Sequence, residues 1–195
     1  MAGMGLAQTG QSPKPPANGP LPQAPGLPPI GAPAPMAPVQ PPPVVEGVDA
    51  AHGGSDTGAK IGAGILEKDV TLALAGRLRS VLKARGVDVV MTRQTDTDVP
   101  PLDRAQTANH AQAAACLVIH ATATGSGLHL YTSSLGPTAR TAFLPWATAQ
   151  AAFVTQSLKL ESEIDSALAH AAIPVTLGRA SVRPMDNLAC PEVAV

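Results

Sequence analysis

The distribution of proline divides this chain into two parts that cannot fold in the same way. Fourteen of the 21 prolines lie between Pro13 and Pro43, mixed with Gly, Ala and Gln. A segment of this composition has too few large apolar side chains to bury a core, and it favours extended polyproline II structure. We therefore predict that residues 1–43 are a disordered proline-rich linker. A spacer is the favoured interpretation, and a ligand for a proline-recognising domain is the alternative.

From residue 44 onward the chain alternates strand and helix signals. In the first expected helix, Val70, Leu74, Leu78, Val81 and Leu82 form one apolar stripe, and Gly86 follows as a stop signal. This order predicts a single α/β domain over residues 44–195, with a mixed, mostly parallel sheet and helices on both faces. Strands are expected at 44–50, 87–92, 117–120, 128–132, 175–177 and 193–195, and helices at 67–85, 102–114 and 146–172, the last broken near 157–159.

Composition excludes several classes of partner. The net charge of −1 and an aromatic content of 2% argue against a nucleic-acid-binding surface. No apolar stretch is long enough to span a bilayer, and no signal peptide is visible at the start of the sequence. The two cysteines, Cys116 and Cys190, do not suggest a disulfide framework. Because Cys116 lies in an expected buried strand, we predict an inert, apolar thiol there.

Three residues with metal-binding side chains lie at the ends of expected elements. His52 follows the first strand, Glu67 opens the first helix and His120 ends a later strand. Taken singly, each is compatible with a structural histidine or with a glutamate that complements a helix dipole. Together they can converge at one edge of a sheet, where sites gather in α/β folds. Two imidazoles and one carboxylate are a ligand set of catalytic zinc, and they leave the fourth position free for water.

The sequence around these residues resembles one enzyme family. The segment from Asp49 to Ala59, which reads DAAHGGSDTGA, is similar to the first motif of the zinc-dependent type 3 N-acetylmuramoyl-L-alanine amidases. Similar segments follow in the same order and spacing, so that the resemblance covers roughly residues 45–132 and continues more loosely to the end. These further segments are Leu66–Val70, Val89–Asp96, Leu102–Asn109 and Val118–Ala121.

The resemblance implies a function, a cofactor and a location. His52, Glu67 and His120 would bind Zn²⁺, and the substrate would be peptidoglycan. The bond cut would be the amide between N-acetylmuramic acid and L-alanine. The protein would then work in the cell envelope, in the periplasm or outside the cell. The sequence identifies no activator or anchoring domain.

The end of the sequence departs from the family pattern. The family's catalytic glutamate would come directly after Val195, so the domain is expected to be incomplete at its C-terminus and its catalytic residue is unassigned. Glu192 is the only carboxylate on the last strand, and we expect it to be a surface or edge residue and not a substitute. The alternative function is therefore a non-catalytic peptidoglycan-binding module that keeps the fold and the metal. A third hypothesis is an adaptor that recruits partners through its proline-rich arm.

Two arginines in the similar segments have two interpretations. Arg93 and Arg104 could bind peptidoglycan carboxylates through bidentate contacts. The structural interpretation is favoured: Arg93 would clamp a turn beside Asp96 and Asp98, and Arg104 would lie on a helix surface. His129 is expected to be a solvent-facing strand residue.

Overall fold

The computed structural model describes residue 19 and residues 44–138, 146–180 and 188–195. The predicted disordered linker, residues 1–43, therefore lies outside the described residues except for Gly19, which is exposed. The chain divides into a unit of residues 1–40 and a unit of residues 41–195. The fold described here is that of the second unit.

The described residues form one six-stranded sheet with the strand order β2-β1-β3-β6-β4-β5. β1 pairs in parallel with β2 and β3, and β3 pairs in parallel with β6. β4 pairs in parallel with β5 and antiparallel with β6, so the sheet is mixed and mostly parallel, as predicted. The strands are β1 Val45–Ala50, β2 Asp88–Met91, β3 Ala115–Ile119, β4 Leu128–Ser133, β5 Val175–Ala180 and β6 Glu192–Ala194.

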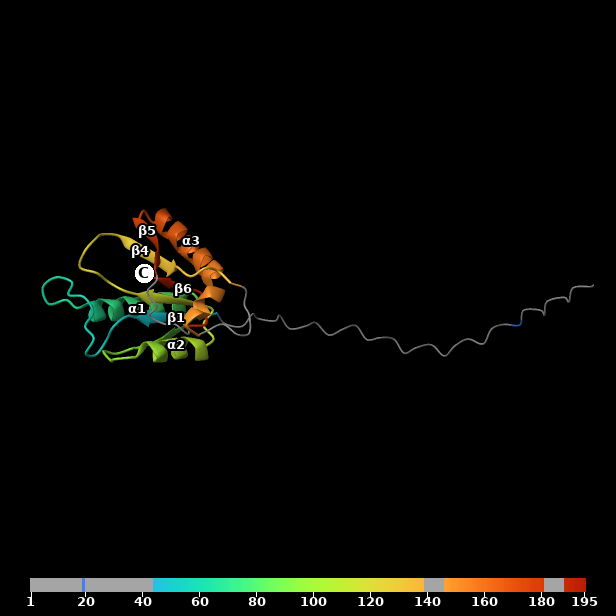
Figure 1. Ribbon diagram of the computed structural model, residues 1–195, viewed down its shortest axis with the longest axis horizontal. Helices are drawn as coiled ribbons and strands as arrows, with labels where there is room; N and C mark the ends of the chain where they lie inside the picture. Colours follow the sequence, from blue (N-terminus) through green and yellow to red (C-terminus); the bar gives the residue numbers. More distant parts are fainter. Residues whose placement is uncertain (1–18, 20–43, 139–145, 181–187) are drawn as a thin grey trace, which may run out of the picture. The chain divides into compact units, whose positions relative to one another are not determined.

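Helices cover both faces of the sheet. The α-helices among the described residues are α1 Glu67–Ala84, α2 Pro101–His110 and α3 Val154–His170, and a 3₁₀ helix, η1 Trp146–Ala152, precedes α3. Figure 1 shows α1 and α2 on either side of β1. α3 packs against β4, β5 and β6. In the part of the chain described here, none of the helices has the length and apolar character needed to cross a membrane.

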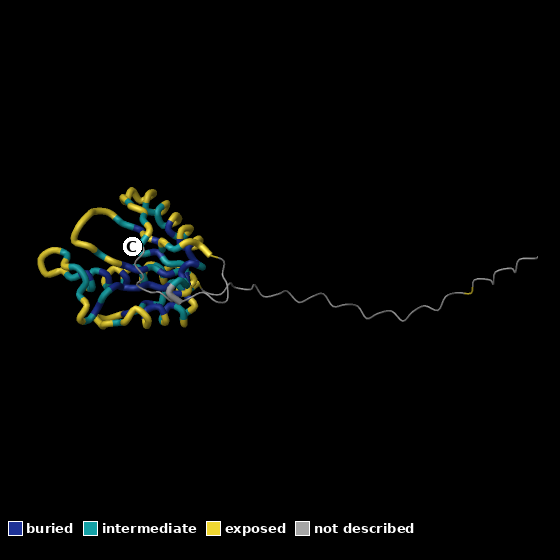
Figure 2. Tube along the Cα trace, viewed as in Figure 1, coloured by how far each residue is buried: buried dark blue, intermediate teal, exposed yellow. Residues whose placement is uncertain are grey.

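The alternation of side chains along the strands creates two cores. On one face, Val48 and Ala50 of β1 and Ile119 of β3 pack against Ala75 of α1. On the other face, Cys116 and Val118 of β3 pack against the alanines of α2. Neighbouring residues of a strand point to opposite faces, which explains why β3 contributes to both cores. Figure 2 shows the buried residues concentrated along the strands, between exposed helix surfaces.

The prediction of a free, inert thiol at Cys116 was wrong. Cys116 forms a disulfide with Cys190, with a Cα–Cα distance of 6.2 Å. The pairing arises because Cys190 immediately precedes the segment that joins β3: the Cys116 N–H donates to the Pro191 carbonyl at 2.8 Å. The two cysteines are 74 residues apart in the sequence. Their contact depends on the tertiary pairing of β3 with β6.

Some element boundaries differ from the prediction. α2 ends at His110, and the Ala114 N–H instead donates to the Val45 carbonyl of β1 as the chain enters β3. The break expected near residues 157–159 lies earlier, at Phe153 between η1 and α3, and Ser157 is inside α3. The early end of α2 arises because the chain at Ala114 already pairs with β1.

Candidate metal centre

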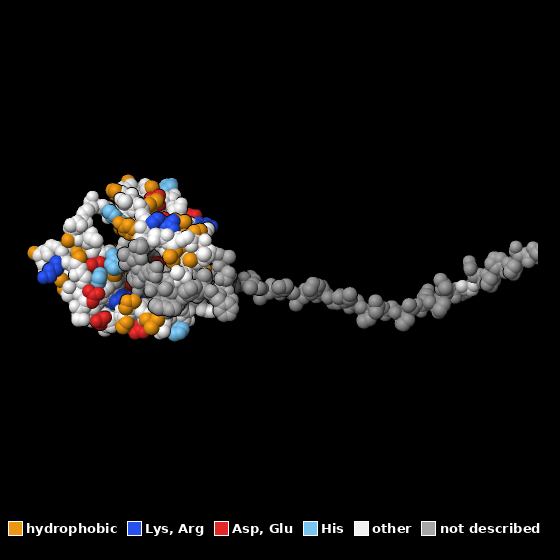
Figure 3. All heavy atoms as spheres, in the orientation of Figure 1, with side chains coloured by type: hydrophobic (Ala, Val, Ile, Leu, Met, Phe, Trp, Pro, Cys, Tyr) orange, Lys and Arg blue, Asp and Glu red, His pale blue; other side chains and the backbone are white. Residues whose placement is uncertain are grey.

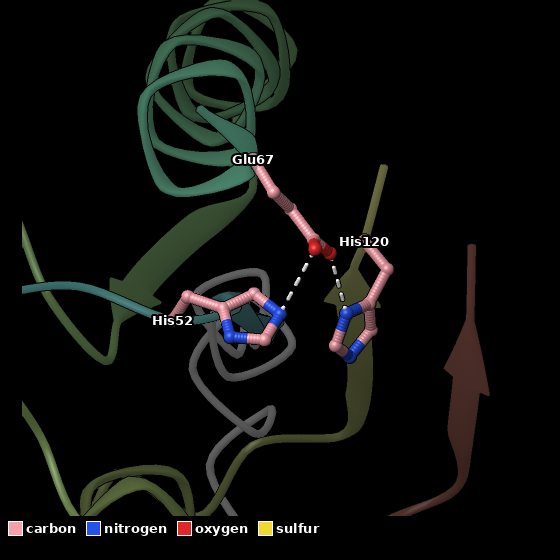
Figure 4. Close-up of side chains that lie close together, drawn as sticks. All are labelled: His52, Glu67 and His120. Atoms are coloured by element: carbon pink, nitrogen blue, oxygen red, sulfur yellow. Dashed lines mark hydrogen bonds and ion pairs between the residues drawn. The ribbon is translucent and has the colours of Figure 1, made fainter. Parts of the chain in front are cut away.

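His52, Glu67 and His120 come together at one edge of the sheet (Figure 4). His52 and His120 follow the neighbouring parallel strands β1 and β3, and Glu67 is the first residue of α1. The His52 Nε2 atom lies 3.1 Å from Glu67 Oε2, and the His120 Nδ1 atom lies 2.9 Å from Glu67 Oε1. One ligand-type atom from each of the three residues lies within 4.8 Å of the others.

This donor set fits a zinc ion. Ligand atoms at about 2.0–2.2 Å from a tetrahedral zinc are separated from each other by about 3.3–3.6 Å. The two imidazole–carboxylate distances of 3.1 and 2.9 Å are slightly shorter than that, so small side-chain movements would admit the ion. The His120 side chain is 40% exposed and that of Glu67 only 7%, so the site is closed on the helix side and open beside His120.

The surroundings of Glu67 favour its charged form. Burial raises the pKa of this carboxyl, but hydrogen bonds from the backbone N–H groups of Ala59 and Ala121 and from His120 lower it below its usual value overall. The two N–H donors lie at 2.8 and 3.0 Å, one on each carboxylate oxygen. Glu67 is therefore ionised, as a metal ligand must be.

A second carboxylate orients His52. Asp56 Oδ2 lies 2.8 Å from His52 Nδ1, and Asp56 Oδ1 accepts a hydrogen bond from the Gly58 N–H at 3.1 Å. This contact leaves His52 Nε2 directed at Glu67, an arrangement common among histidines that bind metals. Sequence reasoning missed Asp56, although a carboxylate four residues after a candidate ligand histidine was an available signal.

A family model described as N-acetylmuramoyl-L-alanine amidase matches residues 47–184. The chain belongs to the N-acetylmuramoyl-L-alanine amidase family. The match includes all three candidate ligands and most of the sheet.

Two sequence relatives match parts of the amidase-family domain. A germination-specific N-acetylmuramoyl-L-alanine amidase of Bacillus subtilis is 52% identical over 54 residues, which are 28% of this chain and 22% of the relative. The amidase AmiA of Escherichia coli is 43% identical over 74 residues, 38% of this chain and 26% of the relative. The matched parts thus span about a quarter of these relatives.

The structure of the amidase Ami1 of Mycobacterium smegmatis has a TM-score of 0.58 at 22% identity, covering 77% of this chain and 80% of that one. AmiC2 of Nostoc punctiforme has a TM-score of 0.53 at 23% identity, covering 77% of each chain. At this level of identity, these two structures support the α/β fold.

Gly58 of the amidase-family domain lies directly against two candidate ligands. A Cβ atom added there would be 2.6 Å from Glu67 Oε2 and 2.6 Å from His52 Cδ2. The residue also has a φ of +62°, which glycine adopts readily and other residues do not. Gly58 therefore keeps the space that the ligand side chains occupy, a role that sequence reasoning missed.

Both arginines of the similar segments are buried and bind the protein itself. The prediction that Arg104 lies on a helix surface was wrong: it is 7% exposed and points from α2 to the end of β1. Arg93 is 3% exposed and binds backbone carbonyls, as the structural interpretation predicted. Its partner is not Asp96, however, because Lys68 binds that carboxylate at 2.7 Å.

Glu192 is neither an edge nor a surface residue, so that prediction was wrong. It belongs to β6, which lies between β3 and β4 in the sheet, and it is half-buried. Burial, with a smaller contribution from Asp49, raises the pKa of Glu192 to about 7. Its register partner is Cys116, four residues before His120, whereas the Val195 carbonyl accepts the His120 N–H at 2.7 Å. The carboxyl end of β6, and not Glu192, lies next to the third candidate ligand.

Space for a large ligand adjoins His120. A cavity of about 900 Å³ lies between the loop after β3 and the neighbouring strands, and its lining includes His120, Thr122, His129 and Glu192.

His129 is half-buried and stacks on Tyr131, with 6.4 Å between ring centroids, rather than facing solvent freely. Figure 3 shows histidine and acidic side chains side by side on one face of the domain.

Proposed function

We propose that this chain is a zinc-dependent peptidoglycan amidase that hydrolyses the amide bond between N-acetylmuramic acid and L-alanine. One observation carries the proposal. Two imidazoles and a buried carboxylate lie within 4.8 Å of one another, inside the segment that matches the N-acetylmuramoyl-L-alanine amidase family. A purely structural cluster would be expected to be closed to solvent, whereas the exposed side chain of His120 leaves this one open.

Each residue has a defined task in this proposal. His52, Glu67 and His120 hold the ion, and Asp56 fixes the orientation of the His52 ring. When bound, zinc supplies a Lewis acid and lowers the pKa of a water ligand towards neutrality. The open side of His120 and the adjoining cavity provide room for a bulky polymer.

We propose that the residue directly after Val195 is the general base of this reaction. The contact between the Val195 carbonyl and the His120 N–H supports this placement, because it brings the end of β6 beside the metal ligands. A chain extended by one glutamate after Val195 should hydrolyse peptidoglycan faster than one extended by a glutamine. Equal rates for the two extended chains would contradict the placement.

The proposal places the protein in the cell envelope, where peptidoglycan lies. The Cys116–Cys190 disulfide supports this location, since such bonds form and persist in oxidising compartments. The second candidate function is a peptidoglycan-binding module without catalytic activity. The position of Glu192 favours this candidate. This carboxylate of β6 pairs with Cys116 and is not next to the three candidate ligands, so it does not supply a general base there.

Zinc analysis and a digestion assay test the proposal together. The 195-residue chain should contain about one zinc, and the same chain extended by one glutamate after Val195 should release stem peptides from purified sacculi. His52→Ala and His120→Ala should lose both properties. His110→Ala is the matched control, because His110 is an exposed histidine at the end of α2.

The outcomes separate the candidates. Equal zinc content in wild type and His52→Ala would contradict the metal site. Zinc binding and sedimentation with sacculi, without release of peptides by the chain extended by glutamate, would favour the binding module.

A further inference from the structure

The backbone of His52 adopts a conformation that needs support from its surroundings. Its φ of +61° lies in the left-handed region, which a residue with a Cβ atom rarely occupies. Such conformations persist where neighbouring groups enforce them, and they concentrate at functional sites. The question is therefore which groups hold the His52 backbone in place.

Arg104 binds the His52 backbone directly. Its Nη2 donates to the His52 carbonyl at 2.8 Å, and its Nη1 donates to the Ala50 carbonyl and to Asp49 Oδ1, each at 2.8 Å. Its Nε donates to the Val99 carbonyl at 2.7 Å. One guanidinium thus binds the carbonyls of the residues before and after Ala51, in the turn at the end of β1. A lysine cannot reproduce this, because its ammonium has three donors at one point rather than a planar fork.

Arg93 connects the end of β1 to the helix that carries Glu67. Its Nε donates to the Ala50 carbonyl at 2.8 Å, and its Nη2 donates to the Ala51 carbonyl at 3.0 Å. The same Nη2 donates to the Lys68 carbonyl at 2.7 Å and to Thr71 Oγ1 at 3.1 Å, both in α1. Thr71 closes the network by donating to the Ala51 carbonyl at 2.9 Å.

We propose that Arg93 and Arg104 are positioning residues of the metal centre, which set the His52 imidazole against the Glu67 carboxylate before any metal binds. Neither guanidinium touches a candidate ligand side chain, so both act through the backbone. The proposal rests on the proposed function, because it assigns them to the same site.

The charges of these two side chains argue against a general stabilising role. Both arginines are nearly fully buried, and among the described residues Asp49 is the carboxylate that pairs with Arg104. Burying charged groups has a high desolvation cost, which well-packed apolar side chains would avoid. The planar arginine fork offsets part of this cost by binding several acceptors at once, and it thereby holds them in one arrangement. Here those carbonyls belong to the segments that carry His52 and Glu67.

The test compares Arg93→Lys and Arg104→Lys with Arg79→Lys in the full chain. Arg79 lies in α1, and its hydrogen bonds reach Gln94 and Met91 and not the backbone around His52. Zinc affinity is measured by competition with a chromophoric chelator. We expect Arg93→Lys and Arg104→Lys to bind zinc about 10–100-fold more weakly than wild type, the usual effect of losing groups that orient metal ligands. Arg79→Lys should match wild type.

A second readout uses the metal-free protein. The Ala59 and Ala121 amides donate to the Glu67 carboxylate, so their hydrogen exchange reports whether that carboxylate is held in place. Exchange at both amides should be faster in Arg93→Lys than in wild type and Arg79→Lys. Thr71→Val removes the part of this link that runs through the threonine hydroxyl, with little change of volume, and it replaces Arg93→Lys if that variant does not fold.

A destabilised control separates positioning from stability. Val154→Ala empties part of the core at α3, where Val154 is 1% exposed. It should lower the unfolding temperature without weakening zinc binding. If Val154→Ala weakens zinc binding as much as Arg93→Lys does, the effect is one of general stability and the positioning role is overturned.

The remaining outcomes separate this inference from the proposed function. Unchanged zinc affinity in Arg93→Lys and Arg104→Lys, beside a wild type that binds zinc, would overturn the positioning role and leave the amidase proposal intact. A wild type that binds no zinc would overturn the proposed function. Faster exchange at Ala59 and Ala121 would then still support the positioning of Glu67.

Discussion

At the scale of single residues, the candidate metal centre depends on the absence of a side chain at Gly58 as well as on the side chains of the candidate ligands. Gly58 faces Glu67 and His52 with no Cβ atom, and its φ of +62° suits glycine. Asp56 reaches His52 from the same turn and is itself held by the Gly58 N–H. The turn after β1 therefore orients one candidate ligand, His52, and leaves space for another, Glu67.

We predict that Gly58→Ala weakens zinc binding at least tenfold and lowers the free energy of unfolding by about 1–2 kcal/mol. The added methyl group would collide with two ligands, and alanine is strained at positive φ. Chelator competition and chemical denaturation measure the two effects. Gly76→Ala is the control, because Gly76 lies inside α1 with open space around its Cβ position and should become slightly more stable as alanine. A Gly58→Ala protein with wild-type zinc affinity would refute the prediction.

A second prediction at this scale concerns Glu192. Burial raises the pKa of this carboxyl from 4.5 to about 7, so the folded protein binds its proton more tightly than the unfolded chain does. The stability that this proton contributes is fully present below about pH 4.5 and is lost as the pH rises through about 7. Glu192→Gln keeps the neutral form at every pH. The free energy of unfolding of this variant should match that of wild type at about pH 4. At about pH 8 it should exceed that of wild type by at most about 3 kcal/mol.

Denaturant unfolding of wild type and Glu192→Gln at the two pH values measures this difference. Glu163→Gln is the matched control, since it removes an exposed carboxylate from α3. The same pH dependence in Glu163→Gln and Glu192→Gln would mean that burial of Glu192 is not the cause.

At the scale of elements, the sheet depends on a short strand held by a covalent bond. β6 has three residues, Glu192–Ala194, yet it lies between β3 and β4 and joins the two parts of the sheet. The disulfide from Cys190 to Cys116 fixes its start beside β3, and the Val195 contact to His120 fixes its end. The position of β6 is therefore coupled to the strand that carries the third ligand.

We predict that the double variant Cys116→Ala/Cys190→Ala loses about 2–4 kcal/mol of unfolding free energy, the typical contribution of a disulfide that closes a long loop. Denaturant unfolding under oxidising conditions measures the loss. The same experiment with a reducing agent is the control: reduced wild type should fall to the stability of the double variant. No difference between oxidised wild type and the double variant would show that the bond does not stabilise the fold.

At the scale of the whole molecule, the proline-rich segment and the amidase-family domain have different physical requirements. The domain buries apolar residues on both faces of its sheet. Residues 1–43 have a composition that cannot form such a core. The domain is thus expected to fold without them.

We predict that deleting residues 1–43 leaves the thermal unfolding midpoint and the zinc content unchanged. Differential scanning calorimetry and metal analysis of the full and shortened chains measure both. A clearly lower midpoint in the shortened chain would show that the segment packs on the domain and is not a linker.

Local signals in the sequence were sufficient for the order of elements and for the candidate ligands. The apolar stripe of α1 and the runs before His52 and His120 follow from periodicities of helices and strands, which neighbouring residues impose. The three candidate ligands converge as predicted because β1 and β3 are parallel neighbours, whose carboxyl ends meet at one edge of the sheet. The family motifs around them also extend over short stretches of sequence.

By itself, the sequence determined the α/β class and singled out His52, Glu67 and His120 as candidate metal ligands. Only the tertiary structure decided the Cys116–Cys190 bond, the inward direction of Arg93 and Arg104 and the burial of Glu192. The physical reason is the same in each case. These features depend on which strands and helices become neighbours across long stretches of chain, and no local pattern encodes that choice.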